Sequence, residues 1–135
     1  MKSKLQLNKR TGIYLRLSKD DEKAGDSLSI ENQRYILRKY VADNGLELID
    51  EYVDDGYSGT NFERLEVQKL LEDAKNGKID TIIVKDLSRF GRNYIFVGQY
   101  VDYIFPMYNV RFIAISDNVD TANTNSAGMD MMPIN

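Results

Sequence analysis

Short apolar runs alternate along the chain with longer segments whose apolar residues recur every three or four positions. The runs are typical of strands, and the longer segments are typical of amphipathic helices. Their order, strand–helix–strand–helix–strand–helix–strand, predicts an α/β domain with an open, mainly parallel sheet and flanking helices. The predicted strands are 11–17, 46–53, 81–84 and 110–115. The predicted helices run from a cap at Asp26 or Ser27 to about Asn44, from about Arg64 to Asn76, and from about Asn93 to Phe105.

One polar residue lies on the apolar stripe of the first predicted helix. Ile30, Leu37 and Val41 form that stripe, and Gln33 falls on it one turn after Ile30. Because a buried polar side chain needs hydrogen-bond partners, Gln33 is predicted to make a specific contact.

Glycine and proline residues mark the predicted ends of the helices. Gly45 follows the first helix, Gly77 follows the second, and Pro106 stands just beyond the third. Glycine readily adopts the left-handed conformation that ends a helix, and proline lacks the N–H that would continue one.

Segments rich in turn-forming and small polar residues are predicted to be flexible. They are the loop 54–61 and the two ends of the chain, 1–10 and 120–135. No repeat or domain boundary interrupts the sequence, so residues 1–135 are expected to form a single domain. The last residues, 129–135, look cut from a longer protein.

Composition narrows both the location and the chemistry. No apolar run is long enough to span a membrane, and no signal peptide is recognised, so we expect a cytoplasmic protein without a membrane partner. The sequence contains no cysteine and no histidine, which excludes thiolate nucleophiles, Ser-His dyads and imidazole metal ligands. The net charge of -3 argues against coating nucleic acid by charge alone, but it allows a local basic site.

The first predicted strand ends in an arginine and a serine two residues apart. Side chains at i and i+2 of a strand point to the same face, so Arg16 and Ser18 deliver a permanent cation and a hydroxyl to one place. Ligands of open parallel sheets bind beyond the carboxyl ends of the strands, and Asp54 and Asp55 follow the second strand. The alternative is that polar loops simply follow the strand ends.

A second charged group follows the third predicted strand. Arg89 and Arg92 are three residues apart, so on a helix both would project the same way, and Asp86 is placed to orient one of them. Guanidinium groups match phosphate oxygens in a bidentate geometry and stay charged at any working pH. A serine with several arginines is therefore suited to attack a phosphodiester. The alternative for Asp86, Arg89 and Arg92 is a surface salt bridge.

Four ordered motifs resemble the serine recombinases of the resolvase/invertase family. They are Tyr-Leu-Arg-Leu-Ser at 14–18, Ser-Leu-Ser-Ile-Glu-Asn-Gln at 27–33, Tyr-Ser-Gly-Thr-Asn-Phe-Glu-Arg at 57–64 and Val-Lys-Asp-Leu-Ser-Arg-Phe-Gly-Arg at 84–92. The third motif is most similar to the large branch of phage integrases and transposon-encoded recombinases. The resemblance extends from about Gly12 to Thr121 and implies a resolvase-like catalytic domain.

The resemblance also implies a role for each matching residue. Ser18 corresponds to the nucleophile that attacks DNA and forms a 5′-phosphoserine link, followed by strand exchange and religation without metal, cofactor or ATP. Asp86 corresponds to an orienting carboxylate, Gln33 to a glutamine near the serine, and Asp55 to an acidic residue of the site. The family's active-site arginines, which would hold the DNA phosphate, correspond to Arg16, Arg64, Arg89 and Arg92.

The implied partner is double-stranded DNA at recombination sites, bound by a homodimer that pairs into a synaptic tetramer. Relatives continue into a long dimerisation helix and DNA-binding domains, so the present chain is expected to be close to inactive alone. Large-branch relatives usually have Pro-Gly after the third motif, whereas this chain has Leu65 and Glu66. That difference changes the start of the second predicted helix and the aim of Arg64.

Two rival functions fit parts of the sequence. A receiver-like phosphoacceptor domain would use the acidic pairs Asp20-Asp21 and Asp54-Asp55 to bind magnesium, but Arg16 inside the pocket argues against it. A non-catalytic interaction module would keep the fold without the chemistry. The aromatic residues between Asn93 and Phe105 exceed one helix face, which is typical of core packing combined with a protein contact.

Overall fold

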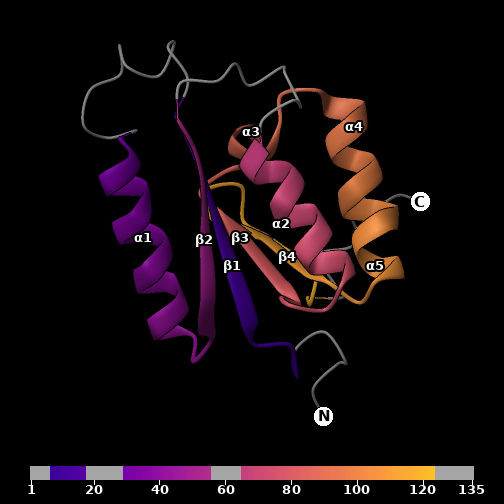
Figure 1. The fold of residues 1–135 in the computed structure, drawn as a ribbon, viewed down its shortest axis with the longest axis horizontal. Helices are drawn as coiled ribbons and strands as arrows, with labels where there is room; N and C mark the ends of the chain where they lie inside the picture. Colours follow the sequence, from indigo (N-terminus) through magenta and orange to yellow (C-terminus); the bar gives the residue numbers. More distant parts are fainter. Residues whose placement is uncertain (1–6, 18–28, 56–64, 124–135) are drawn as a thin grey trace.

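A five-stranded sheet with helices on both faces forms the domain (Figure 1). The computed structural model describes residues 7–17, 29–55 and 65–123. The strand order is β2-β1-β3-β4-β5, in which the first four strands are parallel and β5 is antiparallel to β4. The predicted fold class is thereby confirmed. The strands are β1 (Arg10–Leu17), β2 (Glu47–Asp55), β3 (Thr81–Val84), β4 (Arg111–Ala114) and β5 (Val119–Asp120).

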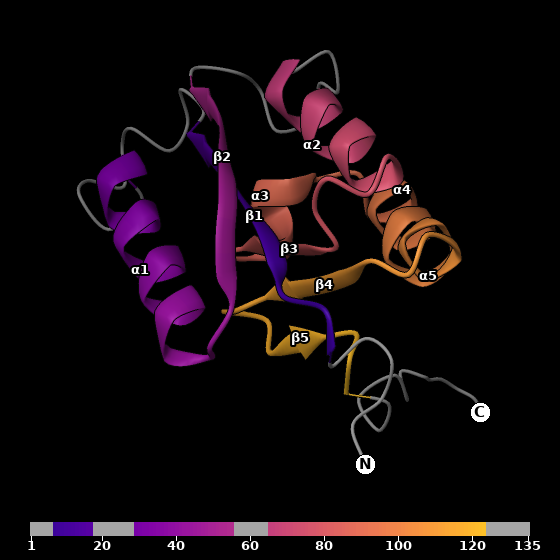
Figure 2. The same cartoon turned by 60° about the horizontal axis from the view of Figure 1, so that its bottom comes forward.

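The helices cover the sheet unequally (Figure 2). On one face, α1 (Ile30–Asp43) packs Leu37 and Val41 against the central strands. On the other, α2 (Leu65–Lys75) lies beside a long helical segment made of α4 (Tyr94–Gln99), the π-turn η3 (Tyr100–Ile104) and α5 (Phe105–Met107). The four-residue turn α3 (Leu87–Phe90) follows β3 directly. None of the helices described is long and apolar enough to cross a membrane.

The second strand is longer than predicted. Asp54 and Asp55, expected in a mobile turn, belong to β2 and pair with Arg16 and Leu17 of β1. Parallel pairing with the neighbouring strand extends β2 past the point where its apolar pattern stops. The rest of the predicted loop lies outside the described residues.

The first helix begins later than predicted. Ser29, rather than Asp26 or Ser27, caps it, because its hydroxyl oxygen accepts from the backbone N–H of Asn32 at 3.0 Å. The predicted glycine stops are both confirmed: Gly45 has φ +67° and Gly77 has φ +84°.

The third helix continues through its proline. Pro106 stands in the first turn of α5 and does not lie beyond the helix as predicted. A proline has no N–H to donate to the preceding turn, and the π-turn just before it widens the helix, with the Phe105 N–H donating to the carbonyl of Tyr100.

Both ends of the chain, which the sequence predicts to be flexible, contact distant segments where the structure describes them. Arg111 holds Asp120 through two hydrogen bonds, of 3.0 and 2.7 Å, and Ala122 is buried. At the other end, the Asn8 side-chain amide donates to the carbonyl of Asp80 at 3.1 Å. These contacts join segments distant in sequence, so local composition does not reveal them.

Phe90, the last residue of α3, is fully buried among three other rings: Tyr100, Phe105 and Phe112. Phe90→Ala is expected to lower the free energy of unfolding by about 3–5 kcal/mol, because it opens a cavity in this cluster. Tyr94→Ala, at a side chain 91% exposed, is the matched control and should change it by less than about 0.5 kcal/mol. Urea unfolding measures both, and equal small effects would contradict the packing.

Candidate active site

The guanidinium group of Arg16 is buried at the carboxyl end of β1 and lies against α3. Its Nε donates to the carbonyl of Arg89 at 3.2 Å, and its Nη2 donates to the carbonyl of Ser88 at 2.9 Å. Carbonyls at the end of a helical turn are short of partners and carry partial negative charge. From the end of β1, Arg16 therefore holds the last carbonyls of α3.

The side chain of Gln33 hydrogen-bonds both the N–H and the carbonyl of Arg16. The Arg16 N–H donates to the Gln33 side-chain oxygen at 3.3 Å, and the Gln33 side-chain nitrogen donates back to the Arg16 carbonyl at 3.0 Å. The side chain is fully buried on the inner face of α1. The predicted specific contact of Gln33 is confirmed, and it ties α1 to the strand end.

Arg89 completes the same network from α3. Its side chain is buried, and its Nη1 donates to the Arg16 carbonyl at 3.0 Å. Asp86 caps α3 by accepting from the Arg89 N–H at 3.0 Å, and its Oδ1 lies 3.6 Å from Arg89 Nε. The Ser88 hydroxyl also donates to Asp86, at 2.5 Å. Asp86 thus restrains both the backbone and the side chain of Arg89.

The sequence placed Arg89 and Arg92 on one face only if the whole segment were helical, and the helix stops between them. Helix α3 ends at Phe90, and Gly91 has an extended backbone with φ -178°. Arg89 is therefore buried in the network, whereas Arg92 is exposed on the connection to α4.

The structure places four of the seven predicted catalytic residues in one hydrogen-bonded group. They are Arg16, Gln33, Asp86 and Arg89, and Arg92 follows the group along the chain. Ser18 and Arg64 lie outside the described residues. Asp55 is described only as the last residue of β2.

Sequence reasoning missed the part played by Asp54. This carboxylate is buried and accepts three hydrogen bonds: from the Tyr14 hydroxyl at 2.8 Å, and from the backbone N–H groups of Glu66 and Val67 at 3.1 and 3.0 Å. Asp54 caps the start of α2 from another strand and ties it to β1. Nothing in the local pattern near Leu65 predicts a cap eleven residues away.

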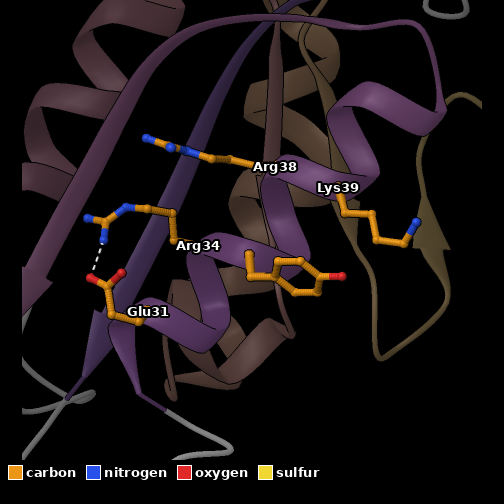
Figure 3. A pocket seen from close by; sticks show the side chains of 5 residues that line it. Glu31, Arg34, Arg38 and Lys39 are labelled. Carbon is orange, nitrogen blue, oxygen red and sulfur yellow. Dashed lines mark hydrogen bonds and ion pairs between the residues drawn. The ribbon is translucent and has the colours of Figure 1, made fainter.

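A separate hollow lies on the outer side of α1 (Figure 3). Its volume is about 420 Å³, and each charged group that lines it is paired, either within the hollow or with an acid beside it. Arg34 donates to Glu31 at 2.5 Å and to Glu51 at 2.9 Å, and the bond to Glu51 raises the pKa of Arg34. Arg38 also pairs with Glu51. Because acids neutralise these arginines and no predicted site residue lines the hollow, it is not the candidate site.

Known proteins share the sequence pattern and the fold of this chain. The family model for the resolvase N-terminal domain matches residues 11–133. The chain belongs to the resolvase family of serine recombinases. The N-terminal catalytic domain of TP901-1 integrase is 30% identical, with a TM-score of 0.80, and the match covers 90% of this chain and 88% of that one.

Other solved structures agree with this assignment. A resolvase family site-specific recombinase from Streptococcus pneumoniae is 28% identical, with a TM-score of 0.71, over 90% of this chain and 87% of that one. The C-terminal catalytic domain of ISC1926 TnpA, an IS607-like serine recombinase, shares the fold at 24% identity and a TM-score of 0.66. That match covers 78% of this chain and 70% of the other.

Asp54→Ala is expected to lower the free energy of unfolding by about 3 kcal/mol, because it leaves the Tyr14 hydroxyl and the N–H groups of Glu66 and Val67 without an acceptor. Tyr14→Phe removes one of these donors and should cost about 1 kcal/mol. Urea unfolding measures both, with Glu72→Ala on the exposed side of α2 as the control. Hydrogen exchange should also speed up at the Val67 amide in Asp54→Ala. Unchanged exchange there would show that Asp54 does not cap α2.

Proposed function

We propose that this resolvase-family domain cleaves and rejoins DNA with Ser18 as the nucleophile. The observation that supports the proposal most is the buried network of Arg16, Gln33 and Arg89, which fixes the end of β1 two residues before Ser18. A nucleophile needs a rigid base to hold it in line with the reacting phosphorus. Ser18 lies outside the described residues, so its role rests on its place in the sequence and on the family.

The reaction is a phosphoryl transfer without a net loss of bond energy. The Ser18 oxygen forms a bond to phosphorus as the bond from phosphorus to the 3′-oxygen breaks, which leaves a 5′-phosphoserine link and a free 3′-hydroxyl. The serine proton is lost and the 3′-oxygen gains one. Rejoining is the reverse attack by a 3′-hydroxyl after strand exchange, so ATP is not needed.

The arginines are proposed to stabilise the negative charge that spreads over the nonbridging oxygens in the transition state. Arg89 is held at a fixed position and is assigned to the reacting phosphate. Arg92 is exposed and suits contact with the DNA backbone. Arg16 donates to the carbonyls of α3 in this structure, so we assign it first to holding Arg89 in place and second to the phosphate.

The proposed substrate is double-stranded DNA at recombination sites, bound by a dimer that pairs into a tetramer. With a net charge of -3, this chain alone is expected to bind DNA weakly at physiological salt. The receiver-like alternative is less well supported. Both oxygens of Asp54 already accept hydrogen bonds from backbone N–H groups of α2 and from Tyr14, so this acid is not placed to bind magnesium or accept a phosphoryl group.

The full-length protein is expected to form a covalent adduct with DNA at Ser18. The experiment uses DNA from the ends of its element with a nick that traps cleavage, and mass spectrometry locates the modified residue. Ser18→Ala should remain folded and bind the same DNA, yet form no adduct. An adduct in the Ser18→Ala variant would overturn the assignment of the nucleophile.

Arg89→Ala is expected to slow adduct formation about a hundredfold or more, comparable to the loss of one oxyanion-hole donor. Single-turnover cleavage at saturating DNA measures the rate, and circular dichroism checks that the variant is folded. Arg38→Ala removes an exposed arginine of α1 that pairs with Glu51 of β2; it is the matched control and should cleave at the normal rate. An unaffected rate in folded Arg89→Ala would remove Arg89 from the site.

A further inference from the structure

The turn between β4 and β5 is hydrogen-bonded to the segment that leads from β3 into α3. Beyond the last strand pair, the Ile115 N–H donates to the Val84 carbonyl at 3.1 Å, and the Ser116 N–H donates to the Lys85 carbonyl at 2.7 Å. The first of these bonds continues the parallel pairing of β3 and β4, and the second adds a contact just past the end of the ladder. The turn is thereby held in register with the start of α3.

The side chain of Asp117 makes the next contact along this line. Its Oδ2 accepts from the backbone N–H of Leu87, the first residue of α3, at 2.7 Å. Asp117 stands in the turn itself, just before Asn118, whose φ is +56°. That left-handed residue reverses the chain into β5, so the antiparallel pairing of β5 with β4 fixes where Asp117 lies.

Helix α3 depends on contacts from outside itself. It has only four residues, and a single helical turn is unstable in isolation because nucleation is unfavourable. Its Arg89 N–H is capped by Asp86, its Leu87 N–H is capped by Asp117, and its last carbonyls are held by Arg16. Of these three residues, Asp117 has no predicted part in catalysis.

We propose that Asp117 is a positioning residue for Arg89. By capping the first N–H of α3, at Leu87, it fixes the orientation of the turn that carries the Arg89 guanidinium, two residues later in the chain. The proposal rests on the proposed function, because it assigns Arg89 to the reacting phosphate. The property that matters is the hydrogen-bond acceptor of Asp117 rather than its charge, since asparagine caps helices about as well as aspartate.

The test compares Asp117→Ala with Asp117→Asn in the full-length protein. Loss of a capping side chain is expected to slow single-turnover adduct formation at Ser18 about tenfold in Asp117→Ala, with DNA affinity within about twofold of the unsubstituted protein. Asp117→Asn keeps an acceptor oxygen and should cleave at nearly the normal rate. Asp43→Ala, at an exposed acid that pairs with Lys39 on α1, is the matched control.

A second measurement does not depend on cleavage. In the 135-residue chain, the NMR signals of the Leu87 amide and of the Arg89 side-chain N–H should shift or broaden in Asp117→Ala and stay near their normal positions in Asp117→Asn. A purely structural role for Asp117 would move the Leu87 signal but leave the Arg89 side chain and the cleavage rate unchanged, and that result would overturn the proposal.

The two measurements separate failure of this inference from failure of the proposed function. If the unsubstituted protein forms no adduct, the proposed function fails, and the Arg89 signals alone decide whether Asp117 positions that side chain. If the adduct forms normally in folded Asp117→Ala, or if Asp117→Asn is as slow as Asp117→Ala, the inference fails while the proposed function stands.

Discussion

The rest of the site depends on one interaction, the hydrogen bonding of the buried Arg16 guanidinium to carbonyls of α3. Burying a cation is costly unless its donors find acceptors. Here the acceptors are the carbonyls of Ser88 and Arg89, at the end of a helical turn where such groups are otherwise short of partners. Arg89 in turn donates to the Arg16 carbonyl, so each arginine fixes the other. Strand β1 and α3 are thus joined at the edge of the sheet that carries the proposed catalytic residues.

Three carboxylates around this site cap the starts of helices. Asp54 caps α2, and Asp86 and Asp117 cap α3, so three acids hold the starts of the two helical segments next to the proposed arginines. Two of these acids come from segments other than the one they cap. An acidic overall balance is therefore compatible with a protein that acts on DNA, because these carboxylates accept hydrogen bonds from backbone N–H groups next to the site.

Much of the fold could be predicted because its cause is local. The apolar runs at 11–17 and 81–84 predicted the central strands, and the stripe on α1 predicted both its buried face and the need of Gln33 for a partner. The predictions went wrong where a distant contact outweighs local composition. Asp54 and Asp55 look like turn residues, but pairing with β1 draws them into β2. The short strand β5 was not predicted, because pairing with β4 and the contact of Arg111 with Asp120 form it rather than a local apolar pattern.

By itself, the sequence determined the order of the first four strands and of the three long helical segments between them, the absence of histidine and cysteine chemistry, and the family to which the chain belongs. These follow from the types of residues and their spacing, both of which can be read directly from one sequence. Only the tertiary structure decided that Arg89 is buried while Arg92 is exposed, that Asp54 caps α2, and that Asp117 reaches α3. Each of these depends on a contact between the end of a helix or strand and a side chain from a different segment. The register of the sheet determines which residues make that contact.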